Sequence, residues 1–326
     1  MQTSIKFRTA PLLFRSAATL ISLAAFTFAF TLGAAPALAE SPISWSWSSS
    51  KTVRGSGNVI EQPVNTASFD SVVAEDGIRV MLRRGAVQKV LVKTDDNLRP
   101  LVEAKVDGTR LLLRMQPRIS ARTKSGAAVM IDYTALNALS LRDGARGELD
   151  AASGSAFQAV VKDGAALTIT EANADNFELT VSDGASATVT KATSATSQRY
   201  KIVDGARLAV DDASGDRVTI SVADGASATF KSVNIKSIDV SVSDGAHLDI
   251  AGIAQLQNFS LAHGAALNAL RLQGASARVR ATDGSVLKLG VVQTLSAEMA
   301  DGSGVRYSGD PNVTMNTRDG GSIRKI

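Results

Sequence analysis

The chain has 326 residues and no cysteine, which excludes disulfides, thiol catalysis and thiolate metal sites. Its formal net charge is +4, and aromatic residues make up only 5% of the composition. Between Lys51 and Ser125, 14 basic and 8 acidic residues leave a net +6. This density is too low for a nucleic-acid footprint, so we predict no nucleic-acid partner.

Residues 1–39 are predicted to be a secretory signal peptide. Three basic residues precede an uncharged apolar run from 17 to 32, and Ala37-Leu38-Ala39 forms a small-x-small cleavage site. The alternative is an uncleaved anchor, because the apolar run is almost long enough to cross a bilayer. No later run has 18 consecutive apolar residues, so no transmembrane segment is expected after cleavage. We expect an exported chain in the periplasm, at the outer membrane or outside the cell.

Residues 40–52 form a Ser-rich segment that is typical of a linker. It contains the only tryptophans, Trp45 and Trp47. Indole rings of this kind stack on sugars in some binding proteins, but they also pack against the end of a fold or lie in a flexible leader.

Residues 53–125 contain short apolar runs separated by turn residues, which predicts irregular β rungs that cap the next region. This segment also carries a set of basic residues that could meet anionic polysaccharide or lipid headgroups, or simply form a solvated face. They are Arg79, Arg83, Arg84, Lys89, Lys93, Arg110, Arg114, Arg118, Arg122 and Lys124.

Residues 126–326 contain ten repeats, each marked by Asp-Gly or, once, by His263-Gly264. Successive repeats are 18 to 21 residues apart. Apolar residues recur at two and four positions before the aspartate and at two, four and six positions after it, as around Asp183. This alternation predicts strand, turn, strand and polar return in each repeat. Because one repeat cannot bury its apolar face alone, stacked copies in a parallel β-solenoid with rungs of about 20 residues are expected.

The N-terminal strands resemble the family called the putative auto-transporter adhesin head, or GIN, domain. The matching motifs are Gly55-Ser56-Gly57-Asn58-Val59, Phe69-Asp70-Ser71-Val72, Asp95-Asp96-Asn97-Leu98 and Val106-Asp107-Gly108-Thr109. The resemblance implies an all-β, right-handed parallel β-helix in an exported protein. It departs from the family pattern at the rung turns, which read Asp-Gly-Ala here where the family usually has Ser-Gly-Ser/Ala-Gly.

The repeated aspartates should form a column with neighbours about 5 Å apart, where like charges repel. We expect backbone N–H groups of the turns to stabilise the carboxylates, which lie partly shielded at a corner. The alternative is a Ca²⁺ ladder, although the calcium-solenoid motif G-G-x-G-x-D is absent. Its ligands would be Asp143, Asp163, Asp183, Asp204, Asp224, Asp244, Asp283, Asp301 and Asp319.

No catalytic residue, cofactor-binding residue or metal site is predicted otherwise. His247 and His263, the only histidines, are not spaced as a ligand pair. Rungs of nearly constant length leave no insertions to build a cleft, and the paired carboxylates of a glycosidase are not recognisable. We therefore predict a non-catalytic envelope protein with a binding, adhesin-like or scaffold role. Its partner would be envelope polysaccharide or another surface protein. The alternatives are a polysaccharide-active β-helix enzyme and a cation-binding solenoid.

Mature protein recovered from the envelope fraction should begin at Glu40, because Ala37 and Ala39 occupy the two positions that the signal peptidase reads. Mass spectrometry of the intact protein measures this. An N-terminus at Met1 in the same fraction would show instead that the apolar run is an uncleaved anchor.

Overall fold

The computed structural model describes residues 51–123, 126–290 and 292–326. The predicted signal peptide, both tryptophans and all of the linker except Lys51 and Thr52 lie outside these residues. Lys51 and Thr52 belong to the first strand, β1 (Lys51–Arg54), so the linker prediction was too long by two residues. In the described ranges, no helix is long and apolar enough to cross a membrane.

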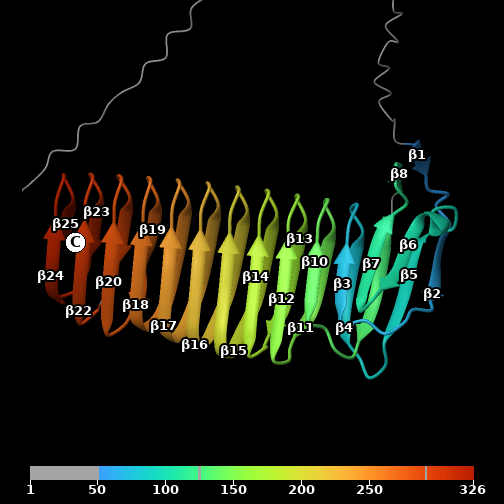
Figure 1. Ribbon diagram of the computed structural model, residues 1–326, viewed down its shortest axis with the longest axis horizontal. Coiled ribbons are helices and arrows are strands. Elements are labelled where there is room, and N and C mark those ends of the chain that lie inside the picture. Colours follow the sequence, from blue (N-terminus) through green and yellow to red (C-terminus); the bar gives the residue numbers. More distant parts are fainter. Residues whose placement is uncertain (1–50, 124–125, 291) are drawn as a thin grey trace, which may run out of the picture. The chain divides into compact units, whose positions relative to one another are not determined.

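The chain forms a β-solenoid of about nine turns, as predicted, in which each rung supplies one strand to each of two sheets (Figure 1). Sheet I contains the cap strand β7 (Arg110–Met115) and the strands that lead into the Asp-Gly corners: β3 (Ser71–Ala74), β10 (Ala138–Leu141), β12 (Ala156–Val161), β14 (Asn176–Val181), β20 (Ser276–Ala281), β22 (Thr294–Met299) and β24 (Asn312–Thr317). Sheet II contains the cap strand β9 (Ala128–Tyr133) and the strands that leave the corners: β4 (Arg79–Arg84), β11 (Arg146–Ala152), β13 (Ala166–Ala172), β19 (Ala266–Gln273), β21 (Val286–Leu289), β23 (Gly304–Tyr307) and β25 (Ser322–Lys325).

The longer strands in the middle of the stack pass through sheet II, bend, and continue in sheet I. They are β15 (Ser186–Ile202), β16 (Arg207–Val222), β17 (Ser227–Val242) and β18 (His247–Leu261). Pairing between successive rungs is parallel, with Leu179 opposite Tyr200 and Tyr200 opposite Ile220. Parallel pairing in constant phase confirms a coil that winds one way, whereas its right-handed sense stays a prediction.

The corner between the two strands of a rung is a two-residue turn in which both residues have positive φ. The aspartates and His263 lie at 49–56° and the following glycines at 66–80°. At the corner of Asp183 and Gly184, Ala185 N–H donates to the Ser182 carbonyl at 3.0 Å and closes the turn. Positive φ at both central positions is the pattern of a type I′ turn, which only a few residue types adopt without strain.

The core follows the predicted alternation. Leu179 and Val181 are fully buried before the corner of Asp183, and Ala185, Ala187 and Val189 are buried after it. Larger side chains fill the middle of the stack, where the Phe157 and Phe177 rings are stacked with centroids 6.2 Å apart. The remaining aromatic neighbours meet edge to face, at 5.8 Å for Phe177–Tyr200 and 5.1 Å for Tyr200–Phe230. Burial of this interior, rather than disulfides or a bulky globular core, stabilises the fold.

The N-terminal segment caps the stack with antiparallel strands, but its path differs from a simple series of first rungs. The rung of β3 and β4 lies inside the stack, between the rung of β7 and β9 and that of β10 and β11. It has its own corner at Asp76-Gly77, which lies outside the ten sequence repeats. Outside it, β5 (Lys89–Asp95) pairs antiparallel with β9 and with β2 (Val59–Val64), and β6 (Val102–Asp107) pairs antiparallel with β7.

The remaining elements of the cap are short. The 3₁₀ helix η1 (Arg99–Leu101) follows β5, and β8 (Ile119–Arg122) pairs in parallel with β1. The cap therefore extends past residue 125, because β9 belongs to it. The antiparallel strands cover the first parallel rungs and protect their edges from pairing with other chains.

Replacing Val181 with Asp should lower the free energy of unfolding by at least about 3 kcal/mol, because an unpaired carboxylate would enter the core. The neighbouring Thr180 points outward, so Thr180→Asp should cost less than about 1 kcal/mol. Urea denaturation followed by circular dichroism compares the two variants. Equal losses of stability would contradict the register described above.

Candidate functional site

The corner column was the sharpest candidate site in the sequence, and the structure explains its aspartates by backbone conformation. Aspartate, asparagine and histidine are the non-glycine residues enriched at positive φ. His263, with φ of 50°, therefore replaces aspartate without changing the turn. The carboxylates lie at the edge of the stack and are partly shielded there, since the side chains of Asp163, Asp244 and Asp283 are 37%, 47% and 45% exposed. The turn reverses the strand alternation and carries these side chains outward.

In the described residues, backbone N–H groups of the turns do not bond to the carboxylates, contrary to prediction. Each glycine N–H instead donates to the corner carbonyl of the next rung, as in Gly205 to Asp224 and Gly225 to Asp244, both at 3.0 Å. The ten such bonds run from Gly77 to Gly302 with lengths of 2.8–3.0 Å. The corner thus extends the parallel ladder around the edge of the stack.

At several corners, the carboxylate of the column bonds to a nearby side chain. Lys162 lies 2.9 Å from Asp163, and the Ser182 hydroxyl donates to Asp183 at 2.6 Å. His263 lies between its neighbours, with Nδ1 3.2 Å from Asp244 and Nε2 3.8 Å from Asp283. No group of three acidic or histidine side chains that could hold a metal ion occurs in the described part of the chain. A Ca²⁺ ladder stays an untested prediction.

His247 lies apart from this column, on the outer face of sheet II. Its Nε2 is 2.8 Å from Asp249, which also accepts a hydrogen bond of 2.8 Å from Asn268. Burial acts to raise the pKa of Asp249, but the bonds from His247 and Asn268 outweigh it and the pKa is lowered. The group bridges two rungs on an open face and has the character of a surface polar network.

The basic residues that are close together in the N-terminal sequence do not form one patch. Arg79 and Arg83 on β4 face outward from sheet II, as does Lys93 on β5, which is bonded to Glu61. Arg110 and Arg114 belong to β7 in sheet I, where Arg114 pairs with Glu103 at 2.8 Å. Residues that are close in the sequence lie on different surfaces here, because the two strands of a rung belong to two sheets that face solvent on opposite sides. Of the remaining members, Arg84 and Lys89 lie near the β4–β5 turn, Arg118 and Arg122 near β8, and Lys124 outside the described residues.

Two of the motifs that resemble the family, those around Ser56 and Asp96, are hydrogen-bonded to each other in the cap. The Asp96 carboxylate accepts hydrogen bonds from Ser56 and, at 2.9 Å, from Asn58, and these bonds lower its pKa. Asn97 binds the same loop, accepting from Ser56 N–H at 2.9 Å and donating to the Arg54 carbonyl at 2.8 Å. These polar residues therefore fasten the first loop of the chain to the cap, which is a structural role.

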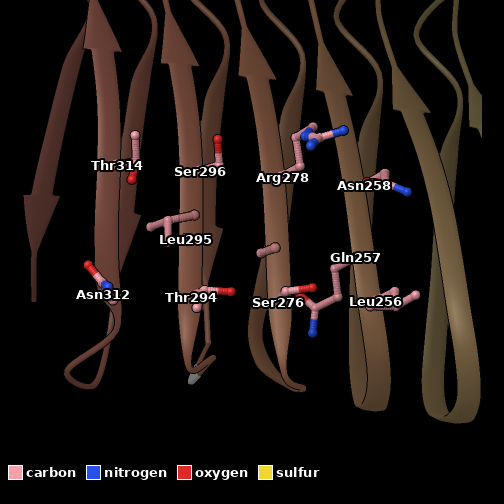
Figure 2. Close-up of a pocket in the computed structure, with 11 residues that line it drawn as sticks. Leu256, Gln257, Asn258, Ser276, Arg278, Thr294, Leu295, Ser296, Asn312 and Thr314 are labelled. Atoms are coloured by element: carbon pink, nitrogen blue, oxygen red, sulfur yellow. The ribbon is translucent and has the colours of Figure 1, made fainter.

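Sequence reasoning missed the outer face of sheet I, where outward residues of successive rungs line up in columns. Over β18 to β24 this face is hollowed into a shallow groove of about 340 Å³ (Figure 2). A second depression of about 430 Å³ continues it toward β16, and Asn258 and Arg278 line both. In the sequence, these outward residues are the polar ones that alternate with the apolar positions. Which of them are neighbours on the surface follows only from the register between rungs.

A model of the family described as putative auto-transporter adhesin, head GIN domain, matches residues 68–208 and 188–311, most of the chain. This chain belongs to that family. Among curated proteins, none matches it. The family membership agrees with the resemblance carried by the N-terminal motifs.

Several solved structures are similar to this member of the GIN family. A putative adhesin from Parabacteroides merdae is 14% identical, with 84% of this chain and 99% of that chain covered and a TM-score of 0.47. A putative adhesin from Parabacteroides distasonis is 16% identical, with 85% and 100% covered and a TM-score of 0.48. A putative lipid binding protein from the same species is 14% identical, with 85% and 100% covered and a TM-score of 0.46.

Replacing both Asp204 and Asp224 with Asn should change the free energy of unfolding by less than about 0.5 kcal/mol, because Asn also tolerates positive φ. Replacing both with Ala should cost roughly 1–2 kcal/mol per corner. Thermal melts with EDTA and with Ca²⁺ supply the control. A Ca²⁺-dependent rise in melting temperature that is lost in the Asn variant would establish a cation ladder and overturn the conformational explanation.

Proposed function

We propose that this GIN-domain protein is exported to the cell envelope and acts there without catalysis, as a binding or scaffold protein. Its partner is an envelope polysaccharide or another surface protein, which it meets along the outer face of the solenoid. The observation that carries this proposal is the parallel register of the rungs, which shifts in β15, β17 and β18 but keeps successive strands of sheet I in phase. It gives long rows of outward polar side chains, spaced by about 4.8 Å, instead of a cleft.

Several features favour binding over catalysis. The groove over β18 to β24 is shallow and lined mainly by hydroxyl and amide side chains such as Ser276, Thr294 and Asn312. The acids near them are engaged, since Asp239 accepts from Asn258 at 2.8 Å and Glu298 pairs with Arg280 at 3.1 Å. A glycosidase needs two carboxylates free to exchange protons on either side of the scissile bond. The adhesin description of the family supports the same reading.

A tagged copy in a native host should be recovered from the periplasmic, outer-membrane or extracellular fraction. The purified protein should retain polysaccharide or a surface protein from an envelope extract. A copy with Val181→Asp, which disrupts the stack, is the control for binding that depends on the fold. Recovery in the cytoplasm, or equal retention by the folded and disrupted proteins, would refute the proposal.

A further inference from the structure

The groove over β18, β20, β22 and β24 is bounded by two rows of outward residues. Since adjacent rungs are about 4.8 Å apart and the rows two residues apart, the rows form a track roughly 7 Å wide along the solenoid axis. The first row contains Leu256, Ser276, Thr294 and Asn312, and the second contains Asn258, Arg278, Ser296 and Thr314. This shape fits an extended polymer that carries hydroxyl groups.

Arg278 supplies a positive charge to this track. Its side chain is exposed and makes no ion pair within the described residues. Its neighbours in the row, Asn258 and Ser296, are uncharged. A guanidinium of this kind can bind a carboxylate through two parallel hydrogen bonds. In Figure 2, Arg278 extends from β20 toward β18, over the side of the groove that Asn258 lines.

One further residue distinguishes this groove from the rest of the face. Leu256 is 53% exposed and offers an apolar contact beside the polar rows. Gln257, between Leu256 and Asn258, is only 1% exposed and takes the inward position that Gln198 occupies three rungs away, so its side chain belongs to the core. The surface offered to a ligand therefore consists of Arg278, Leu256 and the hydroxyl and amide side chains of the two rows.

We infer that this groove binds a linear acidic polysaccharide, with Arg278 holding a sugar carboxylate. Leu256 packs against the C–H face of a ring, and the hydroxyl and amide side chains of the two rows bind sugar hydroxyl groups. This inference rests on the proposed function, because it names the ligand of the same face. An acidic peptide would satisfy Arg278 but would offer few hydroxyl groups to the hydroxyl and amide side chains of the rows.

Titration calorimetry with polygalacturonate fragments tests this site. Arg278→Gln should weaken binding roughly tenfold, the effect of losing one charge-assisted hydrogen-bond pair. Leu256→Ser should also weaken it. Neutral maltooligosaccharides and polyglutamate should bind distinctly more weakly than the uronate.

Two matched variants provide the controls. Arg280→Gln removes a cation two residues away on the same strand that already pairs with Glu298. Arg199→Gln removes an exposed cation from the same row four rungs away, where the register places Glu178 beside it. Each should change affinity less than about twofold, a margin expected of exposed or already paired charges.

Equal losses in Arg278→Gln and either control would overturn the inference, as would equal binding of polyglutamate or absent binding of the uronate. Any of these results, obtained with a protein that is in the envelope and retains an envelope component, leaves the proposed function intact. Failure of the proposed function itself would appear as a cytoplasmic location or as retention that does not depend on the fold.

Discussion

The conformation of the Asp-Gly corner is the constraint on which this structure depends. Two successive residues with positive φ turn the chain from one sheet to the other, and few residue types tolerate this. The glycine N–H then donates to the corner carbonyl of the next rung, so that the hydrogen-bond ladder continues around the edge. Once every corner is fixed in this way, the strands on both sides are held in one register along the stack.

Register connects the fold to the proposed function. Because corners are 18 to 21 residues apart, the same outward position recurs on each rung, and polar side chains from distant parts of the sequence become neighbours. Asn258, Arg278 and Ser296 are separated by about a rung in sequence but adjoin in one row. A surface made in this way favours an extended partner over a small molecule in an enclosed pocket.

The sequence predicted the solenoid well because its signals were local and repeated. The alternation around Asp183 recurs with the same phase, so the buried set could be read directly from it. The path of the cap could not be predicted, because β3 pairs with both β7 and β10 through contacts between segments far apart in the chain. Asp76-Gly77 escaped notice because the excursion through β5 and β6 separates it from the regular spacing.

The candidate site was harder to predict than the fold. The aspartates form the expected column. The glycine N–H groups of the turns were expected to bond to the carboxylates, whereas in the structure they donate to the corner carbonyl oxygens of the next rung. The basic residues from Arg79 to Lys124 were grouped by sequence, whereas the described ones divide between two faces. Arg278 and Leu256 carried no motif, and only their position beside Ser276 and Asn258 distinguishes them.

Amide hydrogen exchange at the corner glycines tests the central role of the backbone ladder most directly. The N–H groups of Gly205, Gly225 and Gly245 bond to the next rung and should exchange as slowly as those of the buried strands. Gly320, for which no such bond occurs in the described residues, should exchange much faster. Fast exchange at all four glycines would contradict the ladder and leave the register of the solenoid to side-chain packing alone.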